Sequence, residues 1–168
     1  MQTPALLKLA KEFAICDRWH ASMPGATWPN RFFVHGASSA GLDHSPNALD
    51  IAIWEAQLGN FKFPNGSIYD RLGKAKCRLY QDKSGPLSGK IPQVAAIKNV
   101  NLSDVRPLSG FEADLAKPYP FGYTFIEPAY GNILNNSYRG GSSQHPLDGL
   151  ASGDRLVAKV YNAIRNSS

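Results

Sequence analysis

Short apolar runs interspersed with helical patterns place the strongest constraint on how this 168-residue chain can fold. Tyr123–Ile126 has the pattern of a good strand, and Cys77–Tyr80 is a possible strand. Apolar residues recur with helical spacing within residues 4–14, 48–58 and 153–165. Strands that alternate with helices predict a single α/β domain, a sandwich with a largely parallel sheet.

Other segments carry weaker structural signals. Phe13–Cys16 follows the first helical pattern as a short apolar run, which predicts a buried strand. Ser67–Leu72 is expected to begin another helix, whereas residues 81–110 have no clear pattern. Within 48–58, the side chains expected on one helix face are Leu49, Ala52, Ile53, Ala56 and Gln57.

Composition excludes several classes of protein. The 18 Lys and Arg residues exceed the 13 Asp and Glu residues, but they are scattered singly, which disfavours a nucleic-acid partner. No apolar stretch reaches the ~20 residues of a membrane-spanning helix, so no transmembrane segment is expected. Cys16 and Cys77 lack zinc-ligand spacing and are expected to be small buried apolar residues.

The segment from Ser22 to Gly41 carries the most chemistry. Thr27, followed by Pro29 and later by Gly36, predicts a helix over about residues 28–36 that Thr27 begins. A hydroxyl at a helix N-terminus lies beside unpaired N–H groups, an environment suited to a phosphate or a developing alkoxide. The alternative is that Thr27 only caps the helix.

Three further side chains are candidates for chemistry. Ser39 sits in a small-residue loop that resembles a serine-hydrolase nucleophile elbow but lacks its first glycine. His145, in a polar loop, is placed to contact a phosphoryl oxygen or protonate a leaving group, unless it is simply exposed. Glu127 ends a predicted strand and is either a site residue or a loop anchor.

Five sequence strings together resemble the phosphoesterase family of non-specific phospholipases C and related acid phosphatases, within the alkaline-phosphatase-like superfamily. They occur in the family's order and span nearly the whole chain. The strings are LAKEFAICDRWHASMPGATWPNR, HGASSAG, SIYDRLGKAKCRLYQD, FIEPAYG and QHPLDGLASGDRLVAKVYNAIRNSS. The resemblance implies a three-layer sandwich with an alkaline-phosphatase-like core.

The resemblance also implies roles for individual residues. Thr27 matches the family nucleophile, two residues before Pro-Asn-Arg, and His145 matches the histidine near the phosphoryl group. Asn30, Arg31 and Glu127 are the expected substrate-binding residues, with Arg31 either orienting the helix of the nucleophile or forming a structural ion pair. Thr27 and His145 are therefore expected to lie close together. Relatives commonly carry an aspartate where this chain has Gly149, with Asp148 one place early.

The family's acidic metal-binding segments at both ends have no counterpart in this sequence. The resemblance thus implies a central piece of such a domain, spanning residues 1–168 and incomplete at both ends, with a divalent metal held mostly by ligands outside the chain. The implied partners are a phosphorylated small molecule or a phospholipid head group, with association through exposed sheet edges. We expect this chain alone to hydrolyse phosphate esters feebly or not at all; a non-catalytic, anion-binding remnant and a serine esterase using Ser39 are the alternatives.

Overall fold

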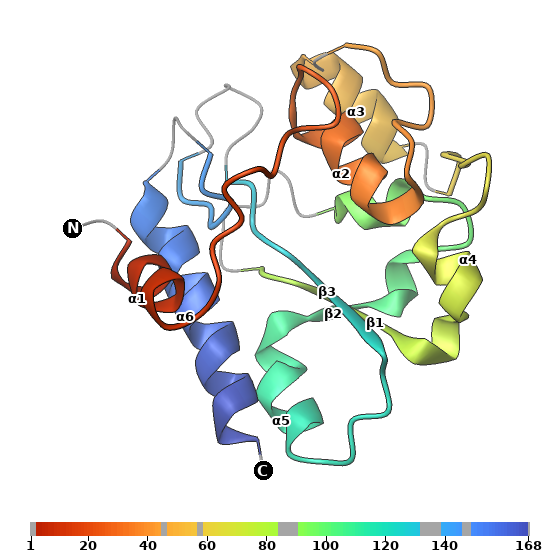
Figure 1. Cartoon of the computed structure of the whole chain (residues 1–168). Coiled ribbons are helices and arrows are strands. Elements are labelled where there is room, and N and C mark those ends of the chain that lie inside the picture. The colour runs from red at the N-terminus through yellow and green to blue at the C-terminus, as the bar shows by residue number, and fades with distance from the viewer. Residues whose placement is uncertain are drawn as a thin grey trace.

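The computed structural model describes residues 3–44, 47–56, 59–83, 91–131, 139–145 and 149–167. Helices and the three strands of a small sheet follow one another along these ranges (Figure 1). The α-helices are α1 (Pro4–Glu12), α2 (Thr27–Gly36), α3 (Ala48–Ala56), α4 (Ile68–Leu72), α5 (Phe111–Leu115) and α6 (Leu150–Asn166). The strands are β1 (Cys77–Gln81), β2 (Val105–Pro107) and β3 (Tyr123–Glu127), and the short 3-10 helices are η1 (Lys74–Lys76), η2 (Gln93–Ala96), η3 (Leu102–Asp104) and η4 (Leu108–Gly110).

The three strands form a parallel sheet in the order β2-β1-β3. Leu79 on the central strand pairs with Val105 on one side and with Phe125 on the other. At the carboxyl end, Gln81 pairs with Glu127. The predicted α/β class and parallel sheet are confirmed. The predicted strands Cys77–Tyr80 and Tyr123–Ile126 each end one residue before the observed strand does.

Both faces of the sheet are covered, which explains why the adjacent residues Leu79 and Tyr80 of β1 are both buried. Leu79 faces a core cluster with Trp28 and Phe32 of α2, while Tyr80 faces the opposite cluster. The second cluster holds residues of α5 and α6, including Phe111 and Leu156. Figure 1 shows α5 and α6 on one side of the strands and α2 and α4 on the other.

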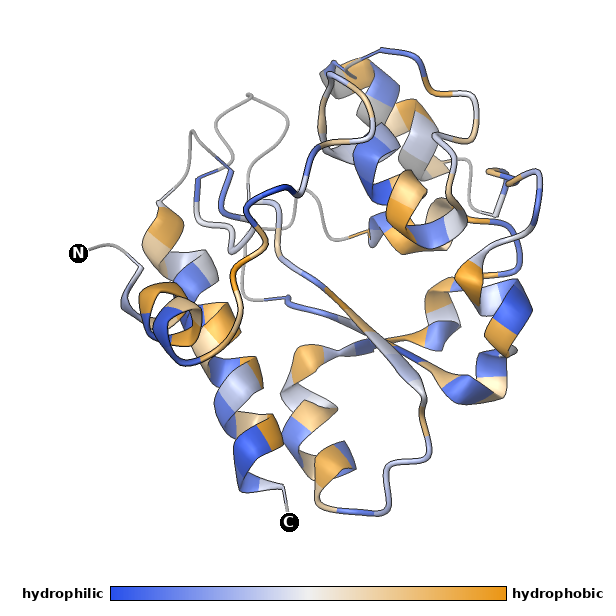
Figure 2. Cartoon of the chain, in the orientation of Figure 1, coloured by the Kyte–Doolittle hydropathy of each residue, from blue (hydrophilic) through white to orange (hydrophobic). Residues whose placement is uncertain are grey.

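The prediction of a buried strand over Phe13–Cys16 is wrong. These residues follow α1 outside any helix or strand, with Phe13 64% exposed and Ile15 71% exposed. Figure 2 shows this apolar stretch leading from α1 toward α2. Cys16 is therefore exposed rather than buried, whereas Cys77 is half-buried against the first core cluster. An apolar run becomes a strand only where another strand offers hydrogen bonds.

The expected face of the 48–58 helix is also wrong in part. Leu49 and Ile53 are 68% and 46% exposed, and α3 instead buries Trp54, which packs edge-on against Trp28 of α2. The large indole outweighs the smaller aliphatic side chains because it removes more apolar surface from water. Gln57 lies outside the described residues. Within the ranges that the structure describes, no helix is long and apolar enough to cross a membrane.

Candidate phosphoryl site

Helix α2 carries the predicted nucleophile at its amino end. Thr27 is the first of ten helical residues, so the predicted helix is confirmed, but Ala26 and not Thr27 is its N-cap. Thr27 is exposed, and Trp28 and Pro29 beside it are buried. The threonine hydroxyl thus stands at the solvent side of a helix start that is fixed in place by its neighbours.

The side chain of Asn30 holds the loop that enters α2. Its Nδ2 donates to the carbonyls of Met23, Gly25 and Ala26, each at 3.1 Å. Its Oδ1 accepts from the Met23 N–H at 3.1 Å. These bonds connect the side-chain amide of Asn30 to the backbone that leads to Thr27, and the expected binding of substrate by Asn30 stays a prediction.

Arg31 lies one helical turn after Thr27 and joins α2 to the carboxyl end of β3. Its Nη1 donates to Oε1 of Gln93 at 2.6 Å and to Oε1 of Glu127 at 3.3 Å. The guanidinium also lies 5.2 Å from the ring centroid of Tyr130. Burial lowers the pKa of Arg31, and the Glu127 charge opposes that effect.

Glu127 is fully buried and receives several donors. The backbone N–H groups of Gln93 and Val94 donate at 2.6 and 3.2 Å, and the Tyr130 hydroxyl donates at 2.6 Å. Burial raises the pKa of Glu127, while the Arg31 charge and the two N–H groups oppose the rise. These contacts match the loop-anchor alternative for Glu127, because the carboxylate ties β3 to η2 and to α2.

Two glutamines at the same end of the sheet were missed by the sequence analysis. Gln81 shares a sheet face with Glu127 through their register, and both residues are buried. Within the described part of the chain, both amide atoms of Gln81 and Nε2 of Gln93 are buried without a hydrogen-bond partner. Gln81 could have been predicted as a site residue because it is a polar residue directly after the predicted strand Cys77–Tyr80.

The loop that carries His145 is attached to the same end of the sheet. The Ser142 hydroxyl donates to Asp82, the residue after β1, at 2.6 Å. Ser142 also exchanges hydrogen bonds with Ala129, two residues after β3. His145 is half-buried three residues further on. The structure thus brings α2 and the His145 loop to the carboxyl ends of β1 and β3, and the close approach of Thr27 and His145 stays a prediction.

His35, on the buried side of α2, differs from the other histidines. It is 1% exposed, its Nδ1 lies 3.0 Å from the Tyr69 hydroxyl, and its ring packs edge-on against Phe125. Burial and the Arg31 charge lower its pKa to about 3. His35 is therefore a neutral core residue.

The nucleophile-elbow reading of Ser39 does not fit the structure. An elbow places its serine between a strand and a helix. Here Ser39 instead follows helix α2, between Ala37 and Ala40, which have positive φ angles of 52° and 56°. The Ser38 hydroxyl accepts the Ala40 N–H at 3.1 Å. This segment is a helix-terminating turn.

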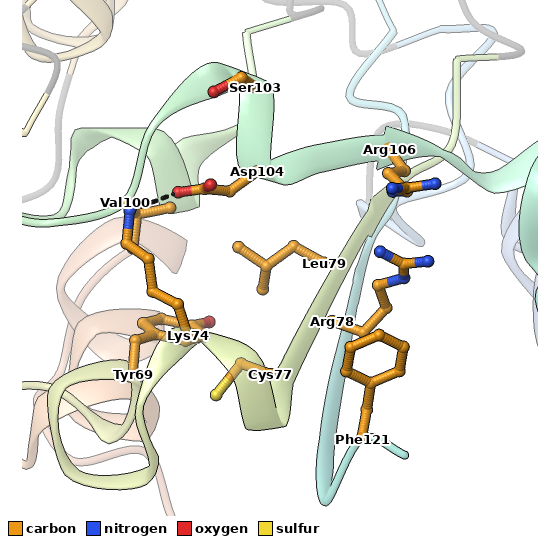
Figure 3. Close-up of a pocket in the computed structure, with 10 residues that line it drawn as sticks. All are labelled: Tyr69, Lys74, Cys77, Arg78, Leu79, Val100, Ser103, Asp104, Arg106 and Phe121. Carbon is orange, nitrogen blue, oxygen red and sulfur yellow. Dashed lines mark hydrogen bonds and ion pairs between the residues drawn. The ribbon is translucent and has the colours of Figure 1, made fainter. Parts of the chain in front are cut away.

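A hollow of about 200 Å³ lies beside the amino half of β1, and Thr27 is not among its lining residues (Figure 3). Four of its ten lining residues are charged, and two of its three cations are paired. Lys74 binds Asp104 at 2.8 Å, and Arg78 binds Asp114 at 2.7 Å while lying 4.5 Å from the Phe121 ring centroid. These pairs tie η1 to η3 and β1 to α5, which indicates a structural role.

The side chains that could bind a metal ion are scattered over the described residues. In the described ranges, no group of three or more His, Cys, Asp or Glu side chains could hold a metal ion. The described residues therefore do not form a metal site by themselves. Asp148 lies outside the described residues, and Gly149 is the N-cap of α6.

The fold and the polar cluster at the carboxyl ends of its parallel strands define an α/β protein with a candidate anion site where such folds bind ligands. The chain belongs to the Phosphoesterase family, whose model matches residues 1–168. It is 32% identical to non-specific phospholipase C6, 31% identical to non-specific phospholipase C3 and 30% identical to non-specific phospholipase C5, all of Arabidopsis thaliana. Each match covers 98% of this chain and 29% of the relative, so the chain spans less than a third of the relatives' length.

Proposed function

We propose that this chain forms the nucleophile-bearing part of a phosphoric-ester hydrolase. Thr27 is the nucleophile, and His145 is the general acid that protonates the leaving oxygen. The observation that carries the proposal is the placement of Thr27. It is exposed at the first position of a ten-residue helix whose Arg31 is anchored at the carboxyl end of β3. Membership of the Phosphoesterase family supports the reaction class.

The proposed reaction proceeds in two displacements at phosphorus. The Thr27 hydroxyl gives its proton to a water molecule and its oxygen bonds to phosphorus, while the bond from phosphorus to the leaving oxygen breaks and His145 protonates that oxygen. Water then hydrolyses the phosphothreonine. The N–H groups of Thr27 and Trp28 at the start of α2 stabilise the charge on the transferring group. The described residues supply no cluster of metal ligands to this reaction.

The substrate class follows from the relatives. Their printed names describe phospholipases C, so we propose a phospholipid head-group ester as substrate, with a phosphorylated small molecule as the second candidate. The alkaline-phosphatase-like sandwich belongs to the same proposal. It is supported by a parallel sheet with helices on both faces.

The experiment measures hydrolysis of a chromogenic phosphomonoester and of a phosphatidylcholine analogue, with and without divalent metal ions. It is run on this chain and on a longer chain that includes the family's acidic segments. The proposal expects turnover by the longer chain that Thr27→Ala abolishes and Thr27→Ser retains, whereas Ser39→Ala has no effect. Turnover that survives Thr27→Ala would overturn the assignment, and no turnover under any condition would favour an anion-binding remnant.

A further inference from the structure

A basic groove opens at the carboxyl end of the sheet on the face opposite α2. Its volume is about 640 Å³, within the usual range for small-molecule sites. The walls come from the ends of β1 and β2, the loop over Gly140–Ser142 and the first turns of α6. Asp82 and Leu156 both line it, which places it on the side of the second core cluster.

The charge of the groove is unbalanced toward the positive. Among the described residues, three cations line it, namely Lys83, Arg155 and Lys159, against the single carboxylate of Asp82. That carboxylate already accepts the Ser142 hydroxyl at 2.6 Å. All three cations are exposed, so each can turn toward a ligand in the groove.

Hydroxyl and backbone groups accompany these cations. Ser109 and Ser152 line the groove, and the Ser152 Oγ accepts from Nη2 of Arg155 at 2.8 Å. A guanidinium, two ammonium groups and hydroxyls in one concave surface match the oxygens of a phosphate group carrying two negative charges. In the hollow at the amino half of β1, two of the three lining cations, Lys74 and Arg78, are instead paired with carboxylates.

We propose that this groove binds a phosphomonoester group, either of a soluble molecule or of a lipid head group. The site is separate from Thr27 and Arg31 but lies at the same end of the sheet. It shares with the His145 loop the residue Ser142, whose hydroxyl holds that loop on Asp82. The inference goes beyond the proposed function and does not require turnover.

The test measures binding of glycerol 3-phosphate by calorimetry, in a Thr27→Ala background that prevents hydrolysis. Replacing both Lys83 and Arg155 by Ser is expected to weaken binding at least about fivefold, since each exposed charge contact contributes modestly. The matched control is Arg165→Ser, an exposed arginine on the same helix about 15 Å beyond Arg155, which is expected to change binding less than twofold. Co-flotation with phosphatidylcholine vesicles, with and without phosphatidic acid, separates a lipid source from a soluble one.

Amide chemical shifts locate the ligand. Glycerol 3-phosphate is expected to shift the N–H signals of Gly140, Gly141 and Ser152. Shifts confined to residues 27–31 would overturn the assignment of binding to the groove, as would equal binding by the double variant and the wild type. Either result would leave the proposed phosphoryl site at Thr27 intact. If the protein bound neither glycerol 3-phosphate nor the vesicles that contain phosphatidic acid, the proposed phosphate site would also be overturned.

Discussion

The Nη1 of Arg31 lies 3.3 Å from Oε1 of Glu127, a carboxylate with no exposed surface. The two residues are 96 positions apart and join the first half of the chain to the end of β3. Because Arg31 is one helical turn beyond Thr27, this pair fixes the direction in which α2 presents the threonine. The pair therefore links the stability of the fold to the geometry of the candidate site.

The first prediction concerns the buried carboxylate. Glu127→Gln is expected to lower the free energy of unfolding by about 3 kcal/mol, because it leaves the Arg31 charge without its anionic partner. The measurement is urea unfolding followed by circular dichroism. Glu112→Gln, at an exposed position on α5, is the control and is expected to have little effect. Equal stability of the two variants would show that Glu127 does not anchor the fold.

Asn30 offers a test of positioning against substrate binding. Asn30→Ala removes three donated hydrogen bonds and one accepted bond, and is expected to cost about 2 kcal/mol in unfolding free energy. Proteolysis at residues 23–26 is expected to accelerate as the loop is released. Asn162→Ala, exposed on α6, is the control. A normal proteolysis rate together with a raised KM would instead assign Asn30 to the substrate.

The buried imidazole of His35 predicts a pH dependence of stability. Its pKa in the folded state is about 3, below the ordinary value of 6.5, so the unfolded chain binds the extra proton. Stability contributed by the neutral ring is thus present above pH 6.5 and is lost as the pH falls toward 3. The expected slope is at most ~1.4 kcal/mol per pH unit.

Urea unfolding between pH 6.5 and 5 isolates this contribution, because most carboxylates titrate below that range. His35→Gln keeps a polar partner for the Tyr69 hydroxyl but cannot titrate, so its stability is expected to vary less with pH over this interval. An unchanged slope in His35→Gln would contradict the prediction.

Asp154 is expected to hold α1 on α6. Its two carboxylate oxygens accept the N–H groups of Ala5 and Leu6 at 3.0 and 2.8 Å, although no side chain of α1 is buried. Asp154→Ala is expected to increase hydrogen exchange at both amides and to cost about 1 kcal/mol, the usual effect of losing a helix cap. Asp17→Ala, at an exposed position after α1, provides the comparison. Unchanged exchange at Ala5 would show that α1 is held by apolar contacts.

Local signals predicted α2, β1 and β3 well because the sequence itself marks their ends. Pro29 and Gly36 mark the two ends of α2, and the polar Glu127 ends an apolar run. The edge strand β2 was missed because it has only three residues, one of them Pro107, and exists through its pairing with β1.

The candidate site was predictable in its residue types but not in its contacts. Thr27 and His145 were recognisable from motifs, whereas Glu127 acts on Gln93 and Val94, which lie more than 30 positions away. No local pattern specifies such partners, since they meet only when η2 packs against β3. Likewise, Phe13–Cys16 has the composition of a strand, but a strand also needs a neighbour that pairs with it.

The last prediction concerns Gly153, where α6 passes the loop that leads to His145. A Cβ atom built on Gly153 would lie 2.1 Å from Cγ of Gln144 and 2.9 Å from the Ser142 carbonyl oxygen, so the helix and the loop must separate to accommodate it. Alanine normally favours a helix interior over glycine by about 1 kcal/mol, so a loss of stability here would report the clash alone.

Gly153→Ala is expected to lower the free energy of unfolding by about 2 kcal/mol, as overpacking of a buried contact does. It is also expected to shift the Ser142 amide signal, because that segment must move. Gly149→Ala is the comparison: a Cβ there meets no atom within 4 Å and φ is −74°, so only the smaller cost of alanine at an N-cap is expected. In the longer chain used for the hydrolysis assay, Gly153→Ala is expected to slow turnover, because displacement of residues 142–144 carries His145 with it. A Gly153→Ala protein as stable and as active as Gly149→Ala would show that this close packing does not position the His145 loop.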